Sequence, residues 1–416
     1  MSGTKLLGRI ARLVAPPDLD VGRRFALWRV RVVMFLKPPD YEGVRLTLRR
    51  LLNLYLLRLE MGFLRSKLWS YPVKLTVEPT NVCNLACPAC FTGDGQVGRA
   101  RRAMSFELYT RLLGEVGDRL MQIEFCNWGE PLLAKQLCEM IEAASRRGIA
   151  TQISTNFSVP FDASRAERLV ASGLAVLGVS IDGAEQATYE QYRIGGNLAT
   201  VLNNCRLVIE AKQRLQSTTP RMIWSFHVFS HNVQDVDRAR TMARELGMDL
   251  CVEKGWTVGS EWNPGSDWRF IAGPFEPFPC LFLWHSAVVN NDGGVSPCCG
   301  TFYREDDMGQ LSLGEGTVGA STFREVWNGP RFQQARRLFR SRTASSESEK
   351  TICYACPVTE VWDRYKTHLA AGLEPRAFDS GRTANDNFNF FWNRRPPGAR
   401  PGGARPGRGP SLNNSG

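Results

Sequence analysis

The stretch Val73-Lys-Leu-Thr-Val-Glu-Pro-Thr-Asn-Val-Cys83-Asn-Leu-Ala-Cys87-Pro-Ala-Cys90-Phe91 joins an apolar, strand-like run to three cysteines spaced C-x3-C-x2-C. Three thiolates on one short loop can hold one corner of a cubane iron–sulfur cluster, which ordinarily takes four cysteine ligands. A cluster with only three protein ligands leaves one iron open, as catalytic metal sites do and structural sites do not. The pattern therefore predicts an iron with room for a small molecule at the end of a strand.

Cysteine triplets also occur in zinc sites and in disulfide frameworks. Zinc knuckles generally show paired C-x2-C spacings, and disulfide scaffolds are typically short secreted chains with a signal peptide. This chain has 416 residues, and we expect no secretory leader in it. The iron–sulfur interpretation is therefore preferred.

Length and composition favour a globular protein with two domains and appendages. Of the 416 residues 43% are hydrophobic, which suffices for a sizeable core. Twelve cysteines without a leader favour a reducing cytoplasm, where thiols bind metals. The net charge of +11 lies at the ends, because residues 1–70 hold 14 basic and 5 acidic side chains and residues 377–416 hold 6 and 2. The nearly neutral middle disfavours nucleic acid as a partner.

Residues 1–70 are expected to form a basic, helical N-terminal extension. The run from Val44 to Leu68 mixes leucines with basic side chains in the manner of an amphipathic helix. Such a helix packs along the core, or it lies on an anionic membrane surface. Packing is preferred, with peripheral contact at the inner membrane face as the alternative to a purely cytoplasmic protein, because no run reaches the ~20 apolar residues of a membrane span. The basic residues of the run are Arg45, Arg49, Arg50, Arg58, Arg65 and Lys67.

The region after this extension alternates strand and helix patterns. Six β/α repeats predict a parallel sheet with helices outside, in a full or partial barrel, with reacting groups at the carboxyl ends of the strands. Ser105 is expected to cap the first of these helices. The predicted strands cover residues 74–78, 122–125, 151–155, 176–181, 223–229 and 250–253, and the predicted helices cover 106–116, 134–147, 164–172, 198–215 and 233–246.

Further motifs follow the ends of the later predicted strands. Each alone is a weak signal, since Ser, Asp and Gly also make ordinary turns. Their order behind the cysteine loop resembles the radical S-adenosylmethionine superfamily over residues 72–254, with Trp128 replacing the first glycine of a Gly-Gly-Glu-Pro motif. The motifs are Asn127-Trp128-Gly129-Glu130-Pro131, Ser154-Thr155-Asn156, Ser180-Ile-Asp182-Gly183, and Tyr189 followed by Arg193.

The resemblance implies that S-adenosylmethionine binds the open iron of a [4Fe-4S] cluster held by Cys83, Cys87 and Cys90. It implies reductive cleavage to a 5′-deoxyadenosyl radical, with an electron from a low-potential donor such as flavodoxin or ferredoxin. A carboxylate in the second motif suits the cationic amino group of the cofactor, and an arginine suits its carboxylate. The implied cofactor-binding residues are Phe91 (on the adenine), Gly129, Glu130, Ser154, Asn156, Ser180, Asp182 and Arg193.

A second cysteine group follows the repeats. Two cysteines flank a glycine in the spacing C-x12-G-x4-C, and a C-x2-C pair comes later. The pattern resembles the SPASM extension of radical S-adenosylmethionine enzymes and implies one auxiliary [4Fe-4S] cluster, closed by four thiolates and suited to electron transfer. A zinc site on the same thiols is the alternative, and Cys299 is an alternative to Cys298. The four cysteines are Cys280, Cys298, Cys353 and Cys356.

The catalytic residues beyond the cluster ligands are unknown from the sequence. A buried free thiol more often fills the core than reacts. In some epimerising relatives a thiol returns a hydrogen atom to the substrate radical, which makes Cys126 and Cys251 candidates. His227 is a candidate acid or base, although histidines such as this one and His231 are more often structural.

The resemblance predicts an enzyme that abstracts hydrogen from a substrate C–H bond for oxidation or cross-linking, with the auxiliary cluster as electron acceptor. A redox-neutral radical epimerase and a non-catalytic iron–sulfur or zinc scaffold are the alternatives. A peptide, a small metabolite and a lipid-linked precursor are all open as substrates. The expected fold is a partial (β/α)6 TIM-like barrel followed by a small α+β SPASM-like domain. The expected divisions are 1–70, the extension; 71–265, the radical S-adenosylmethionine core; 266–370, the SPASM-like domain; and 371–416, a disordered Gly/Pro/Arg-rich tail.

Overall fold

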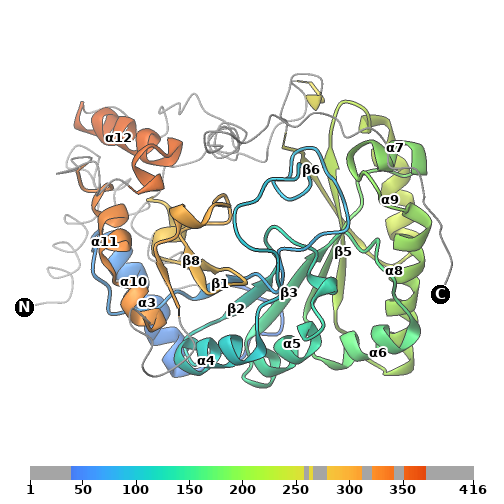
Figure 1. Cartoon of the computed structure of the whole chain (residues 1–416), viewed down its shortest axis with the longest axis horizontal. Coiled ribbons are helices and arrows are strands. Elements are labelled where there is room, and N and C mark those ends of the chain that lie inside the picture. The colour runs from blue at the N-terminus through green and yellow to red at the C-terminus, as the bar shows by residue number, and fades with distance from the viewer. Residues whose placement is uncertain (1–38, 257–261, 266–278, 312–320, 342–350, 372–416) are drawn as a thin grey trace, which may run out of the picture.

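The computed structural model describes residues 39–256, 262–265, 279–311, 321–341 and 351–371 (Figure 1). The predicted tail, apart from its first residue, and the first part of the N-terminal extension lie outside the described residues. Within them, no helix is long and apolar enough to cross a membrane.

A parallel sheet forms the centre of the molecule, and each of its first six strands overlaps a predicted strand. Their order along the sheet is β6-β5-β4-β3-β2-β1, and every neighbouring pair is parallel. Because helices cover a parallel sheet, its strands read as apolar runs, and all five residues of β4 are buried. The strands are β1 (Lys74–Val77), β2 (Gln122–Phe125), β3 (Ala150–Thr155), β4 (Val176–Ser180), β5 (Arg221–Val228) and β6 (Asp249–Lys254).

Five predicted helices connect these strands along the outside of the sheet (Figure 1). Ser105 caps the first of them as predicted, because its side chain accepts a hydrogen bond from the Leu108 amide. Helix α7 (Gln186–Tyr192) was not predicted; it is short, and its N-cap Glu185 makes no side-chain capping bond. The predicted five are α4 (Phe106–Val116), α5 (Leu137–Arg146), α6 (Ala163–Ala171), α8 (Leu198–Arg214) and α9 (Val236–Glu245).

The second cysteine region continues the same sheet. Strand β7 (Ser286–Val289) pairs parallel with β1, in the register Val77 with Val289. Strands β8 (Gly294–Ser296) and β9 (Gly309–Gln310) then add antiparallel, so that one sheet has nine strands. The expected small α+β domain is thus joined to the barrel edge rather than set apart. Its helices are α10 (Phe323–Trp327), α11 (Pro330–Arg337) and α12 (Pro357–Ala370).

The helix predicted from Val44 to Leu68 is shorter, and it packs on the body. It forms α3 (Leu48–Gly62), which begins after Thr47, whose side chain accepts from the Arg50 amide. Arg50 is buried, and its Nε donates to the Leu120 carbonyl at 2.6 Å. One side of this helix therefore packs along the body.

Candidate functional site

The three-cysteine loop lies at the carboxyl end of β1, as predicted. Within the loop, the Cys90 amide donates to the Cys87 carbonyl at 3.2 Å, and the Asp94 amide donates to the Cys90 carbonyl at 2.7 Å. Gly93 lies so close that a Cβ there would be 2.4 Å from the Cys87 carbonyl oxygen. The backbone therefore folds tightly around the three thiols, and a larger residue at Gly93 would open the loop.

The cysteines of this loop lie in a mostly apolar cluster and have two polar contacts. Leu85, Tyr192 and Phe229 pack around the cysteines. The side-chain Nδ2 of Asn156 lies 3.7 Å from the Cys83 sulfur, and Nη1 of Arg193 lies 3.8 Å from the Cys87 sulfur. The sequence motifs behind β3 and β4 thus meet the cysteine loop in space.

Burial keeps these thiols from acting as free nucleophiles. It raises the pKa of Cys83 to about 11 and that of Cys90 to about 12. Thiols with such pKa values stay protonated near neutral pH, and iron would hold them as thiolates because a bound cation deprotonates a coordinating thiol. The donor set, three thiols on one tight loop with donors aimed at two of them, fits a cluster with three cysteine ligands. Within the described ranges no three His, Cys, Asp or Glu side chains are grouped to hold a single metal ion.

A buried charge network runs from the cysteine loop to β5. Arg193 Nε donates to Asp182 Oδ2 at 2.6 Å, and the His227 amide donates to Asp182 Oδ1 at 2.7 Å. The His227 ring Nδ1 lies 3.0 Å from the same oxygen. Burial alone would raise the pKa of Asp182, but the charge of Arg193 and the bonds from His227 lower it to about 2. Asp182 therefore orients both the arginine that reaches Cys87 and the ring of His227.

Glu130 is buried and links two strand ends. Its carboxylate accepts from the Thr155 hydroxyl at 2.6 Å and from the Asn156 amide at 2.8 Å. Next to it, Gly129 approaches the chain so closely that a Cβ would lie 2.0 Å from the Thr80 carbonyl oxygen. The second glycine of the motif is therefore required by close backbone contact, while the role of Glu130 toward a cofactor stays a prediction.

The second cysteine group also converges. Burial, followed by the charges of Cys299, Cys280, Cys353 and Cys356, raises the pKa of Cys298 well above its usual range, which places these sulfurs near one another. The pKa of Cys299 is raised by burial and then by Glu124, with none of the other three cysteines contributing. The pKa of Cys280 is in turn raised by burial and then by Cys356 and Cys299, so the choice between Cys298 and Cys299 stays a prediction. Four thiols from separate segments fit a site closed by protein ligands.

Two family models match the chain in these two regions. The Radical SAM superfamily model matches residues 77–244, and the SPASM iron–sulfur cluster-binding domain model matches residues 280–357. The chain thus contains a radical SAM region followed by a SPASM region. The three-cysteine loop thus falls in the first of these regions, and the second cysteine group falls in the other.

Relatives with known names share part of the chain. Mycofactocin maturase MftC of Mycobacterium ulcerans (strain Agy99) is 28% identical over 190 residues, 44% of this chain and 47% of the relative. The PqqA peptide cyclase of Granulibacter bethesdensis is 28% identical over 180 residues, 42% of this chain and 45% of the relative. The chain spans about half the length of the curated relatives it matches. The crystal structure of Streptococcus suis SuiB bound to precursor peptide SuiA has the same fold, with a TM-score of 0.51 and 13% identity over 80% of this chain and 82% of that chain.

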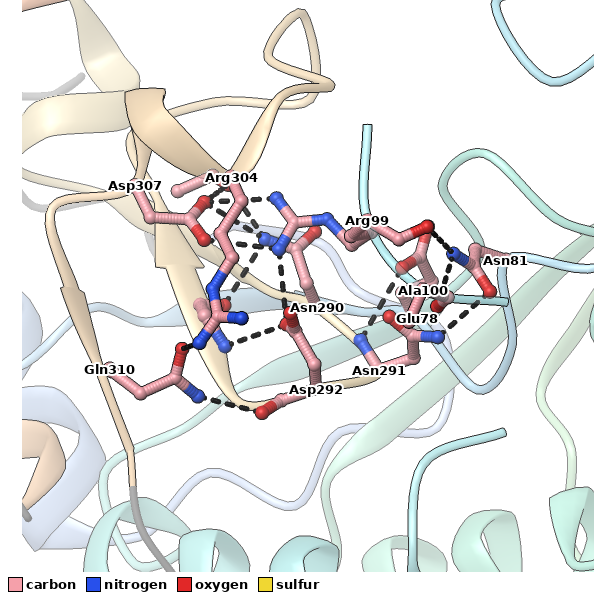
Figure 2. A network of polar contacts seen from close by, with 12 residues as sticks. Glu78, Asn81, Arg99, Ala100, Asn290, Asn291, Asp292, Arg304, Asp307 and Gln310 are labelled. Atoms are coloured by element: carbon pink, nitrogen blue, oxygen red, sulfur yellow. Dashed lines mark hydrogen bonds and ion pairs between the residues drawn. The ribbon is translucent and has the colours of Figure 1, made fainter. Parts of the chain in front are cut away.

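A buried polar network joins the radical SAM and SPASM regions, as Figure 2 shows. Arg99, which follows the cysteine loop, donates to both carboxylate oxygens of Asp307 at 3.0 and 3.1 Å and to Asp292 at 3.0 Å. Beside it, the Asn291 amide nitrogen donates to Asn81 Oδ1 at 2.9 Å. Because these residues are buried and paired, the segment that follows the cysteine loop is tied directly to the SPASM strands.

An aromatic cluster forms a second link between the regions. Phe91 is buried and stacks on Phe302, with ring centroids 4.9 Å apart, and it meets Trp128 edge-on at 4.9 Å. The Trp128 indole nitrogen donates to the Thr301 carbonyl at 2.8 Å. The prediction that Phe91 packs on adenine stays a prediction; its ring is covered here by the SPASM region. Phe302 and the role of Trp128 were missed, and only their aromatic character beside cysteine motifs could have signalled them.

The remaining candidates lie in different places. Ser180 is buried at the end of β4, and Ser154 is partly exposed on β3. Cys126 follows β2 and lies near Cys299 and Glu124, on the side of the second cysteine group. Cys251 lies on β6 at the sheet edge, with its sulfur 3.6 Å from Glu253 Oε1. Of the three catalytic candidates, only His227 is linked to the cysteine loop, through Asp182 and Arg193.

Proposed function

We propose that the chain is an enzyme that cleaves S-adenosylmethionine reductively and removes a hydrogen atom from a substrate C–H bond. The observation that carries this proposal is the meeting of Arg193 with Cys87, 3.8 Å apart. It brings a motif from the fourth strand end to a three-cysteine loop at the first. A permanently charged fork beside an open iron suits the carboxylate of an amino-acid cofactor.

Each of these residues would have its own role in binding. Cys83, Cys87 and Cys90 would hold the cluster, and Arg193, held by Asp182, would orient the cofactor carboxylate. When bound, the cluster and S-adenosylmethionine would supply a 5′-deoxyadenosyl radical. The other cofactor contacts that we propose are Phe91, Gly129, Glu130, Ser154, Asn156 and Ser180, over a core of residues 71–265 followed by a SPASM-like domain at 266–370.

We further propose that the reaction is a net oxidation or cross-link rather than an epimerisation. A closed group of four thiols, Cys280, Cys298, Cys353 and Cys356, suits electron transfer. Removal of a hydrogen atom and then of an electron and a proton from the substrate is a two-electron oxidation, and the second cluster would take up that electron. Neither Cys126 nor Cys251 is linked to the first loop, so the placement of these thiols offers no support for hydrogen return.

A peptide is the proposed substrate class. The support is sequence similarity to the PqqA peptide cyclase, whose name gives a peptide as its substrate. A low-potential flavodoxin or ferredoxin is the proposed electron donor. His227, whose ring is partly exposed and oriented by Asp182, is the proposed acid or base.

Anaerobic reconstitution with iron and sulfide, followed by dithionite and S-adenosylmethionine, tests the first proposal. We expect 5′-deoxyadenosine and methionine to form. Protein that carries intact clusters but never forms 5′-deoxyadenosine would contradict the enzyme proposal. With a peptide that stimulates cleavage, loss of two hydrogen atoms by mass spectrometry supports oxidation, and an unchanged mass with deuterium uptake from D2O supports epimerisation.

A further inference from the structure

Helix α3 carries apolar side chains on both of its sides. Its buried side combines Leu54 and Leu57 with the polar side chains of Arg50, Asn53 and Glu60, while other large apolar side chains of the same helix are exposed. A surface helix normally turns its apolar stripe toward the core. The exposed apolar side chains therefore call for a reason outside the folded body.

The polar contacts beneath α3 fix its orientation. Arg50 donates to the Leu120 carbonyl at 2.6 Å, and Asn53 exchanges two hydrogen bonds with the Tyr71 backbone at 2.8 and 3.0 Å. Glu60 accepts three hydrogen bonds, at 2.6 to 3.0 Å, from the chain just beyond the helix. Rotating the helix to bury its leucines would strip these charged groups of their partners, which is strongly unfavourable. The outward stripe is thus built into the fold.

The exposed stripe is large and continuous along the helix. Leu48 is 73% exposed, Leu52 61%, Leu59 49% and Phe63 70%. Spacings of four, seven and four residues place these side chains on one line of an α-helix. Trp69, 66% exposed, follows shortly after the helix. Contiguous exposed apolar surface of this kind marks an interaction site on a soluble protein.

Basic residues outnumber acidic ones in the sequence around this stripe. Residues 43–69 contain six basic residues and one acidic residue, and the acidic one, Glu60, is buried. The Arg65 guanidinium lies 4.7 Å from the ring centroid of Trp69. Arg49 forms an ion pair with Asp118 at 2.5 Å. The exposed basic residues are Arg45, Arg49, Arg65 and Lys67.

We propose that this face docks the protein on a lipid bilayer that contains anionic headgroups. The apolar stripe would enter the boundary between headgroups and acyl chains, with the basic side chains at the phosphates. A second copy of the chain, related by a two-fold axis, would bring the same basic rim against itself. The inference goes beyond the proposed function and does not depend on it.

Vesicle co-sedimentation of the full chain tests this surface. We expect the protein to bind vesicles of equal parts phosphatidylcholine and phosphatidylglycerol, and to bind vesicles of phosphatidylcholine alone at least tenfold more weakly. The double variant Leu48→Gln/Leu52→Gln should lower partition to the anionic vesicles about tenfold or more. The pair Arg65→Glu/Lys67→Glu should lower it similarly at low salt and have less effect at high salt.

The matched control is Leu215→Gln, which removes another exposed leucine (46% exposed) just beyond the end of α8 and outside the stripe of α3. It should bind the anionic vesicles as the wild type does, and thermal unfolding should show every variant folded. Equal binding to both vesicle types, or unchanged binding by the leucine variant, would overturn the proposal. A dimer in sedimentation velocity that the leucine variant converts to monomer would assign this face to a second copy instead.

Discussion

The two cysteine groups use the same ligand atom in opposite ways. The first places three thiols on one loop of eight residues, Cys83 to Cys90, next to a charged arginine. The second draws four thiols from positions between 280 and 356 and packs two of them, Cys280 and Cys353, against the main hydrophobic core. The first group is local and, as we propose, leaves a ligand position open, whereas the second joins distant segments and would be closed by four thiolates. Ligand number and chain separation, rather than ligand chemistry, therefore distinguish the reactive site from the structural or electron-transfer site.

The largest expected effect comes from removing the first group. In the variant Cys83→Ala/Cys87→Ala/Cys90→Ala, formation of 5′-deoxyadenosine should fall to background, because no cluster is left to bind and reduce the cofactor. Iron analysis after reconstitution should still find about four irons per chain, as one cubane requires. The control Cys138→Ala/Cys251→Ala removes thiols outside both groups and should keep both clusters. Loss of all iron in the triple variant would contradict the two-site comparison.

Removing two cysteines of the second group should lower stability and abolish substrate oxidation without abolishing cleavage of S-adenosylmethionine. Because that group joins distant segments, Cys353→Ala/Cys356→Ala should lower the free energy of unfolding by about 4 kcal/mol or more. Cleavage of S-adenosylmethionine should persist while oxidation of the substrate is lost. Urea denaturation and product analysis under anaerobic conditions measure the two effects. Full substrate oxidation by a variant that lacks the second cluster would show that this group has no part in electron transfer.

Breaking the ion pair between Arg193 and Asp182, beside the first cysteine group, should have the next largest effect. Arg193→Gln leaves the buried carboxylate of Asp182 without its cation, which should cost about 3 kcal/mol of unfolding free energy. The double variant Arg193→Gln/Asp182→Asn should lose less than the sum of the single losses, since the two side chains share one interaction. Arg214→Gln is the matched control, because its pairing with Glu167 is half exposed and should be worth about 1 kcal/mol or less. Additive losses in the double variant would show that the pair is not coupled.

The six parallel strands and the motifs at their ends could be predicted because each depends on local sequence. Apolar runs with polar residues at their ends identify strands, and parallel strands bring their carboxyl ends to one edge. The pairing of Thr76 with Val288 could not be predicted in this way. Four residues such as Ser286–Val289 are too short to assign by period, and a pairing across more than two hundred positions leaves no local signal.

Interactions between charged or aromatic side chains far apart in sequence could not be predicted either. Arg99 and Asp307 are 208 positions apart, and nothing in either neighbourhood indicates the other. The side of α3 that faces the body could not be predicted either, for a different reason. Leucines occur on both sides of that helix, and only the partners of Arg50 and Glu60 determine which side faces the body. Sequence reasoning thus located the site but not the contacts that connect its two halves.

The smallest expected effect concerns one hydrogen bond between those halves. The Trp128 indole nitrogen donates to the Thr301 carbonyl at 2.8 Å, and the Thr301 hydroxyl donates to the Cys298 carbonyl at 2.7 Å. Trp128→Phe keeps a ring against Phe91 but removes the donor, so the free energy of unfolding should fall by about 1 kcal/mol. Trp69→Phe, at an exposed ring, should change it by about 0.5 kcal/mol or less.

Trp128→Gly completes this comparison by restoring the glycine of the family motif. It removes the ring as well as the donor, so the loss should reach about 3 kcal/mol or more. If both Trp128 variants instead match the Trp69 control, the tryptophan does not connect the two cysteine groups, and the polar network around Arg99 alone holds them together. A graded loss, larger for glycine than for phenylalanine, would show that this chain has replaced a flexible motif position with a structural link to its second cluster region.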